Sequence, residues 1–332
     1  MQYRTYNDLS GVIRANIGRF QGHGYDLIVG IPRSGMIPAY MIGLFLNVNV
    51  CTFAQFRDDT VLELPGQRPL SVDVTSPWQA RRVLVVDDSY NTGTRLHELM
   101  DSLPSELRDR CDVWVIYSAR EDVDVDYLEV VELPREFEWN IFHQATHLAT
   151  TAFDMDGVLC RDPTEEENDD GPRYREFIRT ATPLFLPSCP IGGIITSRLE
   201  RYRPLTEAWL RDHGVDYGRL IMLNMDSAEE RRQKQVHGSF KAEELVRGGF
   251  NYFIESDEHQ AREINRLSGK PVYCVATNCL VDEPASEPIS PVTPIAAPVP
   301  SQRRIRDVIA RIPVLGPAIQ RVWHRLKNVT AS

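Results

Sequence analysis

Two pairs of acidic residues each follow a short apolar run of the chain. Asp87 and Asp88 come directly after residues 83–86, and Asp154 and Asp156 come after residues 151–153. Short apolar runs of this kind predict buried parallel strands, and ligands bind at the carboxyl ends of such strands. Carboxylates placed there can hold Mg2+ or accept hydrogen bonds from sugar hydroxyls. The sequence therefore predicts two sites for phosphorylated sugars.

The first acid pair continues into a loop of small, hydroxyl-bearing residues, which leads into a helical pattern of apolar residues at 96–100. The loop contains Ser89, Asn91, Thr92, Gly93 and Thr94. Backbone N–H groups and Thr hydroxyls in such a loop bind phosphate, and the helix N-terminus adds partial positive charge. A diol with a phosphate, as in a phosphoribosyl group, fits this pattern. The alternative is structural, because acids after a strand can also cap the next helix.

A second loop upstream strengthens the phosphoribosyl interpretation. The apolar run 27–31 predicts another strand, and an apolar helix is expected over 36–46. Between them stand Pro32, Arg33, Ser34 and Gly35. In this order and separation, the two loops resemble the diphosphate loop and the phosphoribosyl diphosphate (PRPP) motif of type I phosphoribosyltransferases.

The resemblance implies a type I phosphoribosyltransferase fold over residues 1–146 and a PRPP site. It assigns the diphosphate to the upstream loop, the ribose hydroxyls to the acid pair and the 5-phosphate to the hydroxyl-rich loop. The implied PRPP-binding residues are Arg33, Ser34, Gly35, Asp87, Asp88, Ser89, Asn91, Thr92, Gly93 and Thr94. The chain departs from the family at Arg95, where Thr is common.

Residues 57–80 lie between the two loops, are polar and show no sustained periodicity. They fit the mobile hood that covers PRPP in this family and excludes water during transfer. The hood contains no lysine, so a hood cation must be an arginine, with Arg57 and Arg68 available. An orotate substrate is therefore disfavoured, because the orotate-using branch is expected to carry a hood lysine.

The second acid pair belongs to the segment Asp154-Met155-Asp156-Gly157, in which a turn lets both carboxylates reach one phosphate. Asp154 is the expected nucleophile, forming an aspartyl phosphate, and Asp156 the expected general acid and base. The structural alternative is an acidic turn that has no catalytic role. The segment resembles the first motif of the haloacid dehalogenase (HAD) phosphatase superfamily. The resemblance implies that Thr196, after the apolar strand 191–195, binds the phosphoryl group and that Lys241 steadies its charge. Lys234 is the rival lysine.

A Mg2+ cofactor is implied by the same resemblance. The acidic run 255–258 follows an expected strand at 252–254 and departs from the commoner forms of the family's metal motif. Asp257 is the first choice as ligand and Glu255 the second, beside Asp154 and Asp156. Glu258 fits better as a charge at a helix N-terminus.

Length and composition agree with an α/β protein of two doubly wound domains, a phosphoribosyltransferase domain over 1–146 and a HAD-like phosphatase domain over 147–280. About forty residues separate successive HAD motifs, which predicts little or no cap; the acidic insert 165–170 is best interpreted as a solvated loop. The net charge of −10 argues against general nucleic-acid binding. Neither a signal peptide nor a membrane span is expected, and the six cysteines lack metal-ligand spacing, which favours reduced thiols in the cytoplasm.

The chain beyond 280 changes composition. Residues 281–300 are rich in Pro, Ala, Ser and Glu and predict an extended linker, and residues 301–332 predict a basic amphipathic helical tail with a kink at 313–317. With Trp323 on its apolar stripe, the tail favours the inner face of an anionic membrane. The alternative is a helix that docks on another protein or back on the two domains.

The combination of these two parts in one chain resembles bacterial modules that install ribofuranose in surface polysaccharides. The implied activity is PRPP-dependent phosphoribosyl transfer to a glycan or lipid-linked glycan, followed by removal of the 5-phosphate. The first alternative is nucleobase salvage, with the HAD half acting as a 5′-nucleotidase. The second is a PRPP or nucleotide sensor without turnover, against which the intact Asp154 and Asp156 argue, because binding alone needs no nucleophile.

Overall fold

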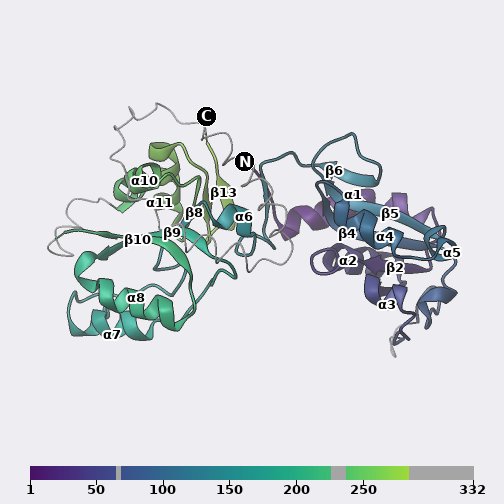
Figure 1. Ribbon diagram of the computed structural model, residues 1–332, viewed down its shortest axis with the longest axis horizontal. Helices are drawn as coiled ribbons and strands as arrows, with labels where there is room; N and C mark the ends of the chain where they lie inside the picture. The colour runs from purple at the N-terminus through teal and green to yellow at the C-terminus, as the bar shows by residue number, and fades with distance from the viewer. Residues whose placement is uncertain (65–68, 226–236, 284–332) are drawn as a thin grey trace, which may run out of the picture. The chain divides into compact units, whose positions relative to one another are not determined.

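A five-stranded parallel sheet is built from the first part of the chain, in the strand order β3-β2-β4-β5-β6. The computed structural model describes residues 1–64, 69–225 and 237–283, and Figure 1 labels its elements. The elements of this part are β1 (Gln2–Arg4), α1 (Tyr6–Gln21), β2 (Leu27–Gly30), α2 (Met36–Leu46), β3 (Asn49–Thr52), α3 (Phe53–Arg57), a 3-10 helix (Pro77–Gln79), β4 (Val83–Tyr90), α4 (Thr94–Asp101), α5 (Ser105–Arg108), β5 (Cys111–Ser118), β6 (Asp126–Val130) and β7 (Arg135–Phe137).

Alternating strand residues bury both faces of this sheet. Ile28 and Leu84 pack with residues of α1 and α2, whereas Leu27 and Val83 pack with residues of α3 and α4. Successive side chains of a strand point to opposite faces, so apolar residues at every position of β2 require a helical layer on each side. β1 and β7 form a separate parallel pair, with Gln2 opposite Arg135.

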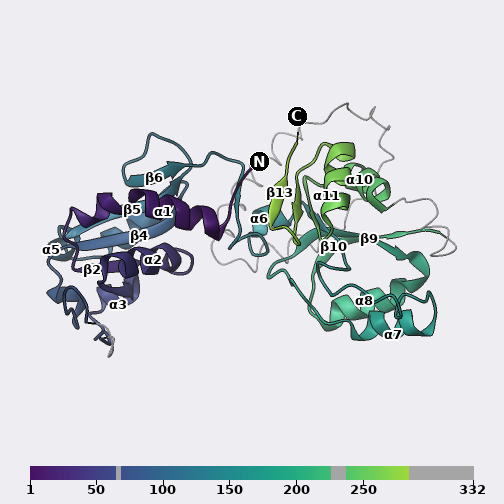
Figure 2. The same ribbon diagram turned by 180° about the vertical axis from the view of Figure 1, so that it is seen from behind.

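A six-stranded sheet follows, in the order β10-β9-β8-β11-β12-β13, and only β13 runs antiparallel to its neighbour. Its elements, preceded by α6 (Ala145–Leu148), are β8 (Thr151–Phe153), α7 (Pro172–Thr180), β9 (Ile191–Leu199), a 3-10 helix (Glu200–Tyr202), α8 (Arg203–Asp212), β10 (Tyr217–Leu223), α10 (His237–Arg247), β11 (Tyr252–Glu255), α11 (Glu258–Ser268), β12 (Val272–Cys274) and β13 (Cys279–Val281). Both ribbon views show α7 and α8 side by side (Figures 1 and 2).

Helices cover both faces of the second sheet as well. Phe153 and Ile194 pack with Phe177 of α7 and Trp209 of α8, and the opposite face packs against α10 and α11. A single helix, α7, lies between β8 and β9. The α/β class with parallel sheets is therefore confirmed.

The strand bearing the first acid pair is longer than predicted. The expected strand 83–86 continues to Tyr90, because β5 supplies hydrogen-bonding partners as far as Ser118. β2 pairs only with Val83 to Val86, so Asp87 and Asp88 lie beyond the end of that neighbour. The acids therefore stand inside β4, beyond the last residue of this strand that pairs with β2.

Several predictions concern parts of the chain that the structure does not describe or test. Arg68, Lys234, the linker beyond 283 and the amphipathic tail lie outside the described residues. The domain boundary at 146/147 falls within α6 and stays a prediction. Within the described ranges, no helix is both long and apolar enough to cross a membrane. All six cysteines are free thiols.

Candidate active sites

The loop after β2 meets β4 so closely that only glycine fits at position 35. A Cβ on Gly35 would lie 2.6 Å from the Ile31 carbonyl oxygen and 2.7 Å from Oδ1 of Asp87. In the same loop, the Ser34 hydroxyl donates to Oδ1 of Asp88 at 2.8 Å. Two predicted motifs that are 54 residues apart in sequence therefore form one site. We call it the β4 site: residues 33–35, the two acids of β4 and the loop 89–94.

Asp88 is buried and has a donor on each carboxylate oxygen. Besides Ser34, the indole Nε1 of Trp139 donates to Oδ2 at 2.7 Å. Trp139 in turn stacks on Phe137 and contacts the half-exposed ring of Tyr6. Trp139 was not among the predicted site residues; its only local signal is an aromatic residue at every second position of 137–139. Asp88 is thus held in one orientation before any ligand binds.

Asp87, the neighbouring acid of β4, has a raised pKa. Burial raises its pKa to about 8, the neighbouring Asp88 carboxylate adds to the rise, and Arg95 partly opposes it. Its one hydrogen bond among the described residues comes from the backbone N–H of Asp88 at 2.9 Å. A cation or a sugar hydroxyl that approached Asp87 would therefore favour the ionised form of an acid that is otherwise mostly protonated at pH 7.

The hydroxyl-rich loop leads directly into α4. Gly93 has a φ of 75°, and a Cβ on it would lie 2.3 Å from the Tyr90 hydroxyl, so the turn requires glycine. The exposed Thr92 and Thr94 hydroxyls lie 3.1 Å apart at the N-terminus of the helix. Ser89 is half-buried on β4 and Asn91 is exposed. This arrangement presents hydroxyl groups and backbone N–H groups to an anion.

Arg33 is the cation nearest in sequence to the Ser34–Gly35 turn. Its side chain is exposed, and within the described part of the chain it has no ion pair or hydrogen bond. An exposed guanidinium without a partner can bind a diphosphate group through two parallel hydrogen bonds.

The second site is organised by Lys241, which is buried on α10. Its Nζ donates to Asp154 at 2.6 Å, to Glu255 at 2.7 Å and to Gln260 at 3.0 Å, so all three ammonium hydrogens are used. We call Asp154, Asp156, Thr196, Lys241 and Glu255 the β8 site. Asp154 follows β8 and Glu255 ends β11, and these two strands are neighbours in the sheet.

One lysine shared by two buried carboxylates leaves an excess of negative charge. Burial raises the pKa of Asp154 to about 7; Lys241 opposes the rise and Glu255 reinforces it. Burial would lower the pKa of Lys241, but Asp154 and Glu255 outweigh burial and raise it. Lys241 therefore stays charged, while Asp154 ionises close to neutrality unless a further cation is present.

The other members of the β8 site come from β9 and from the turn after β8. Thr196 is buried, and its Oγ1 accepts from the backbone N–H of Arg198 at 3.2 Å, which leaves its own hydroxyl hydrogen to donate. Asp156 is partly exposed and forms an ion pair with Arg198 at 2.5 Å. The sequence analysis assigned no role to Arg198.

The two acids proposed as further metal ligands occupy different environments. Glu255 is fully buried beside Lys241, whereas Asp257 caps α11 by accepting from the Gln260 N–H at 2.8 Å. Glu258 lies in the first turn of α11, which confirms its prediction as a helix N-terminal charge. The structure therefore brings Glu255, the second choice of the sequence analysis, into contact with the lysine that holds Asp154.

The carboxylates suit Mg2+ in kind, although no ready-made cage exists. Among the described residues, no three His, Cys, Asp or Glu side chains gather into a metal site. Mg2+ does not require one, because it commonly binds through one or two carboxylates, water and substrate phosphate. The pKa of Asp162 is raised by desolvation of its carboxyl group and then by Asp156 and Glu255, which marks an excess of negative charge that a cation would offset.

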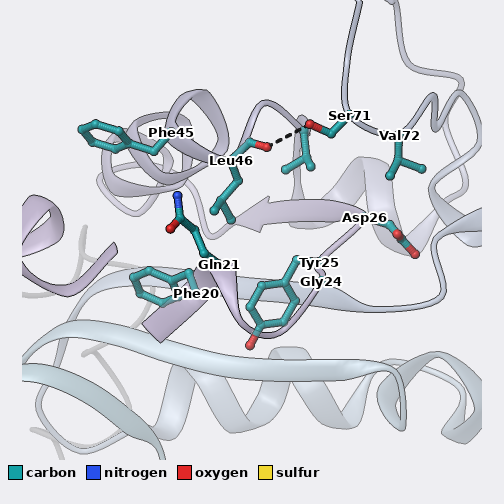
Figure 3. A pocket seen from close by; sticks show the side chains of 10 residues that line it. Phe20, Gln21, Gly24, Tyr25, Asp26, Phe45, Leu46, Ser71 and Val72 are labelled. Atoms are coloured by element: carbon teal, nitrogen blue, oxygen red, sulfur yellow. Dashed lines mark hydrogen bonds between the residues drawn. The ribbon is translucent and has the colours of Figure 1, made fainter. Parts of the chain in front are cut away.

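A pocket of about 270 Å3 lies elsewhere on the first sheet's part of the chain. Figure 3 shows the residues around it, which come from the end of α1 and the loop that follows it, from the end of α2 and the turn that follows it, and from Ser71 and Val72. The Ser71 hydroxyl donates to the Leu46 carbonyl at 3.3 Å. None of the predicted site residues lines this pocket.

Comparisons with known proteins concern the N-terminal part. No protein-family model and no curated protein matches the chain. Among solved structures, it is similar to a purine phosphoribosyltransferase from Pyrococcus horikoshii Ot3, with 21% identity and a TM-score of 0.31 over 42% of this chain and 92% of that one. The xanthine-guanine-hypoxanthine phosphoribosyltransferase of Helicobacter pylori is 14% identical, with a TM-score of 0.30 over 42% of this chain and 93% of that one. A hypothetical protein from Neisseria gonorrhoeae with bound ppGpp is 21% identical, with a TM-score of 0.28 over 42% of this chain and 89% of that one. TM-scores of this size do not establish activity, which has to be argued from the two sites.

Proposed function

We propose that the chain is a bifunctional enzyme, which transfers a phosphoribosyl group from PRPP to an acceptor and then removes the 5-phosphate. One observation carries the proposal: β4 and β8 are interior strands of the two sheets, and each has an acid pair beside groups suited to phosphate, within β4 and directly after β8. At β4 these groups are Arg33 and the loop before α4, and at β8 they are Lys241 and Thr196.

In the first step, the bond between ribose C1 and the diphosphate oxygen breaks, and diphosphate leaves with the electron pair. Arg33 and the N–H groups of its loop stabilise the leaving charge. Asp87 and Asp88 accept hydrogen bonds from the ribose hydroxyls, and residues 91–94 bind the 5-phosphate. The acceptor oxygen bonds to C1 from the opposite face, which gives the β anomer, and the proton of the acceptor hydroxyl passes to water.

In the second step, Asp154 attacks the phosphorus of the 5-phosphate. The ester bond breaks as Asp156 gives a proton to the leaving 5-oxygen, and Thr196 and Lys241 bind the phosphoryl oxygens. Water then hydrolyses the aspartyl phosphate, and Asp156 takes up the proton of that water. The products are a ribofuranosyl unit and inorganic phosphate.

Mg2+ is the proposed cofactor of both steps. In the β8 site, Asp154, Asp156, Glu255 and Asp257 are the residues proposed to hold it. When bound, the ion offsets charge on the phosphoryl oxygens. The raised pKa of Asp154 supports this assignment, because a second cation beside Lys241 would balance the two buried carboxylates.

The proposed acceptor is a hydroxyl of a glycan or lipid-linked glycan. A transferase of this kind leaves a phosphate on its product, and a phosphatase in the same chain meets that product at high effective concentration. A cytoplasmic enzyme with membrane contact through residues 301–332 stays part of the proposal. That segment lies outside the described residues.

Nucleobases are the second candidate acceptors, and one exposed aromatic ring is compatible with them. Tyr6 is 44% exposed, and it contacts Trp139, which binds Asp88. An exposed aromatic ring beside the ribose acids can stack on a base as well as on the apolar face of a sugar. The same ring therefore serves both hypotheses, and only turnover separates them.

The test supplies Mg2+ and PRPP with either a glycan acceptor or a set of nucleobases, and measures diphosphate and phosphate release. Glycan-dependent release of both supports ribosylation, whereas release that depends on a base supports salvage. PRPP binding without turnover contradicts both and favours a sensor. Asp154→Asn should let a 5-phosphorylated product accumulate, and phosphate release at the wild-type rate would show that Asp154 is not the nucleophile.

A further inference from the structure

Arg198, at the end of β9, carries a fully buried guanidinium that is held on several sides. The side chain of Asp156, its ion-pair partner, is 19% exposed, while that of Arg198 is 0% exposed. Nη1 lies 3.4 Å from the Thr206 hydroxyl on α8, and Nη2 donates to the thiol sulfur of Cys160 at 3.2 Å. The Cζ atom of Arg198 lies 5.6 Å from the centre of the Phe177 ring on α7.

The contact with Asp156 uses two nitrogens and both carboxylate oxygens. Nη2 donates to Oδ1 at 2.5 Å, and Nε lies 3.1 Å from both Oδ1 and Oδ2. A planar guanidinium matches a carboxylate in this geometry better than a lysine ammonium can, because its donors form a rigid fork. The carboxylate of Asp156 is therefore fixed in rotation as well as in position.

Stability alone is a poor explanation for this ion pair. Desolvation of a buried charge offsets much of the attraction, so an apolar pair of similar volume is often as stable. The turn that carries Asp156 is tight, since Gly157 has a φ of 76° and a Cβ there would lie 2.3 Å from the Ser256 hydroxyl. Without the guanidinium of Arg198, the Asp156 side chain could still rotate about its own bonds at this turn.

We propose that Arg198 is a positioning residue of the β8 site, which holds Asp156 in the orientation from which it exchanges a proton with the leaving-group oxygen. The inference rests on the proposed phosphatase step and adds a requirement to it. Arg198 does not touch the substrate, and it acts only through Asp156. Its contribution should therefore depend on how much the leaving group needs a proton.

The test compares two phosphate esters in the full-length chain with Mg2+. Ribose 5-phosphate has an alkoxide leaving group that needs a proton, whereas 4-nitrophenyl phosphate has a leaving group that does not. Positioned proton transfer contributes roughly 10²–10⁴-fold to such reactions. Arg198→Met should lower kcat on ribose 5-phosphate about 100-fold with KM nearly unchanged, and lower kcat on the aryl ester less than about tenfold.

A double mutant separates positioning from a general loss of structure. If Arg198 acts through Asp156, the pair Asp156→Asn and Arg198→Met should be no slower on ribose 5-phosphate than Asp156→Asn alone. The inference would be overturned if the fold-loss of kcat in the double mutant equalled the product of the two single-mutant losses. It would also be overturned if Arg198→Met lowered kcat equally on the two esters. Arg203→Met removes a neighbouring arginine that pairs with Glu200 and Glu207, and it should leave both rates unchanged.

Arg198→Lys keeps the charge and decides the question if the methionine variant unfolds. Lysine has no rigid fork of donors that reaches both carboxylate oxygens. Arg198→Lys should therefore lower kcat on ribose 5-phosphate about tenfold and leave kcat on 4-nitrophenyl phosphate unchanged. Equal rates of Arg198→Lys and wild type on ribose 5-phosphate would contradict the proposal. Wild-type protein that hydrolyses neither ester would instead contradict the proposed phosphatase function itself.

Discussion

The indole N–H of Trp139 donates to Oδ2 of Asp88 at 2.7 Å, across 51 residues of sequence. Both residues are buried, and the second oxygen of Asp88 accepts from Ser34. A buried carboxylate with a donor on each oxygen is fixed before any ligand arrives. The β4 site therefore depends on a residue from outside both of its sequence motifs.

Trp139→Phe should remove that donor and leave one buried oxygen of Asp88 without a partner. An unsatisfied buried acceptor costs about 1–3 kcal/mol, or more when the group is charged. We expect the free energy of unfolding in urea to fall by that amount and PRPP binding to weaken. Trp209→Phe is the matched control, since it loses a similar bond to the Ala181 carbonyl in the second sheet's part. Equal weakening of PRPP binding in the control would contradict the prediction.

Asp87 should make PRPP binding depend on pH. Burial and Asp88 raise its pKa to about 8, so at pH 7 it is mostly protonated without ligand. Sugar hydroxyls and Mg2+ favour the ionised form, so binding should release a proton and tighten between pH 7 and pH 9. Calorimetry in two buffers of different ionisation enthalpy measures the proton release. Asp87→Asn should abolish it, and release of the same size in that variant would exclude Asp87 as the source.

The same raised pKa predicts an effect of Asp87 on folding. The folded state binds the proton more tightly than the unfolded state, so the stability that this group contributes falls as pH rises from about 4 to about 8. Asp87→Asn should flatten that part of the stability curve. Urea midpoints at several pH values measure it, and parallel curves for the variant and wild type would show that Asp87 is not responsible.

Lys241→Met should leave Asp154 and Glu255 buried without their shared cation. Removing one partner of a buried pair costs about 3–5 kcal/mol, and phosphatase activity should be lost as well. Adding Glu255→Gln to this variant should recover part of the stability but none of the activity, because one buried charge is removed. Lys270→Met is the control, since Lys270 has no ion pair among the described residues. Urea unfolding and phosphate release measure the two effects.

Gly35→Ala should disturb the β4 site because its new Cβ would lie 2.6 Å from the backbone oxygen of Ile31. Backbone atoms cannot yield as a flexible side chain does, so we expect loss of PRPP binding and of at least about 1 kcal/mol of stability. Gly18→Ala on α1 provides the contrast, because nothing lies within 4 Å of its added Cβ. That variant should be more stable by roughly 0.5–1 kcal/mol. PRPP binding by Gly35→Ala at wild-type affinity would refute the close-approach argument.

The main strands and the acid pairs were predictable from the sequence because they depend on local patterns. The apolar runs at 83–86, 151–153 and 191–195 lie in strands of the two sheets, and the run at 27–31 lies in β2 except for Ile31. Helix α2 was expected at 36–46 and has those bounds. These features follow from the spacing of apolar residues and from glycine at turns, which neighbouring residues largely determine.

The orientation of the acids was decided only by tertiary structure. Which acid of 255–258 meets Lys241 depends on where β11 ends and α11 begins, and the sequence ranked Asp257 above Glu255. Trp139 and Arg198 reach their carboxylates across 51 and 42 residues. Trp139 comes from a segment without a predicted motif, and Arg198 follows the predicted site residue Thr196 without an assigned role. Such contacts arise when packed strands and helices bring distant side chains within hydrogen-bonding distance. Local spacing therefore identified the candidate reactive groups of this protein, whereas packing between sequence-distant elements determined what holds them.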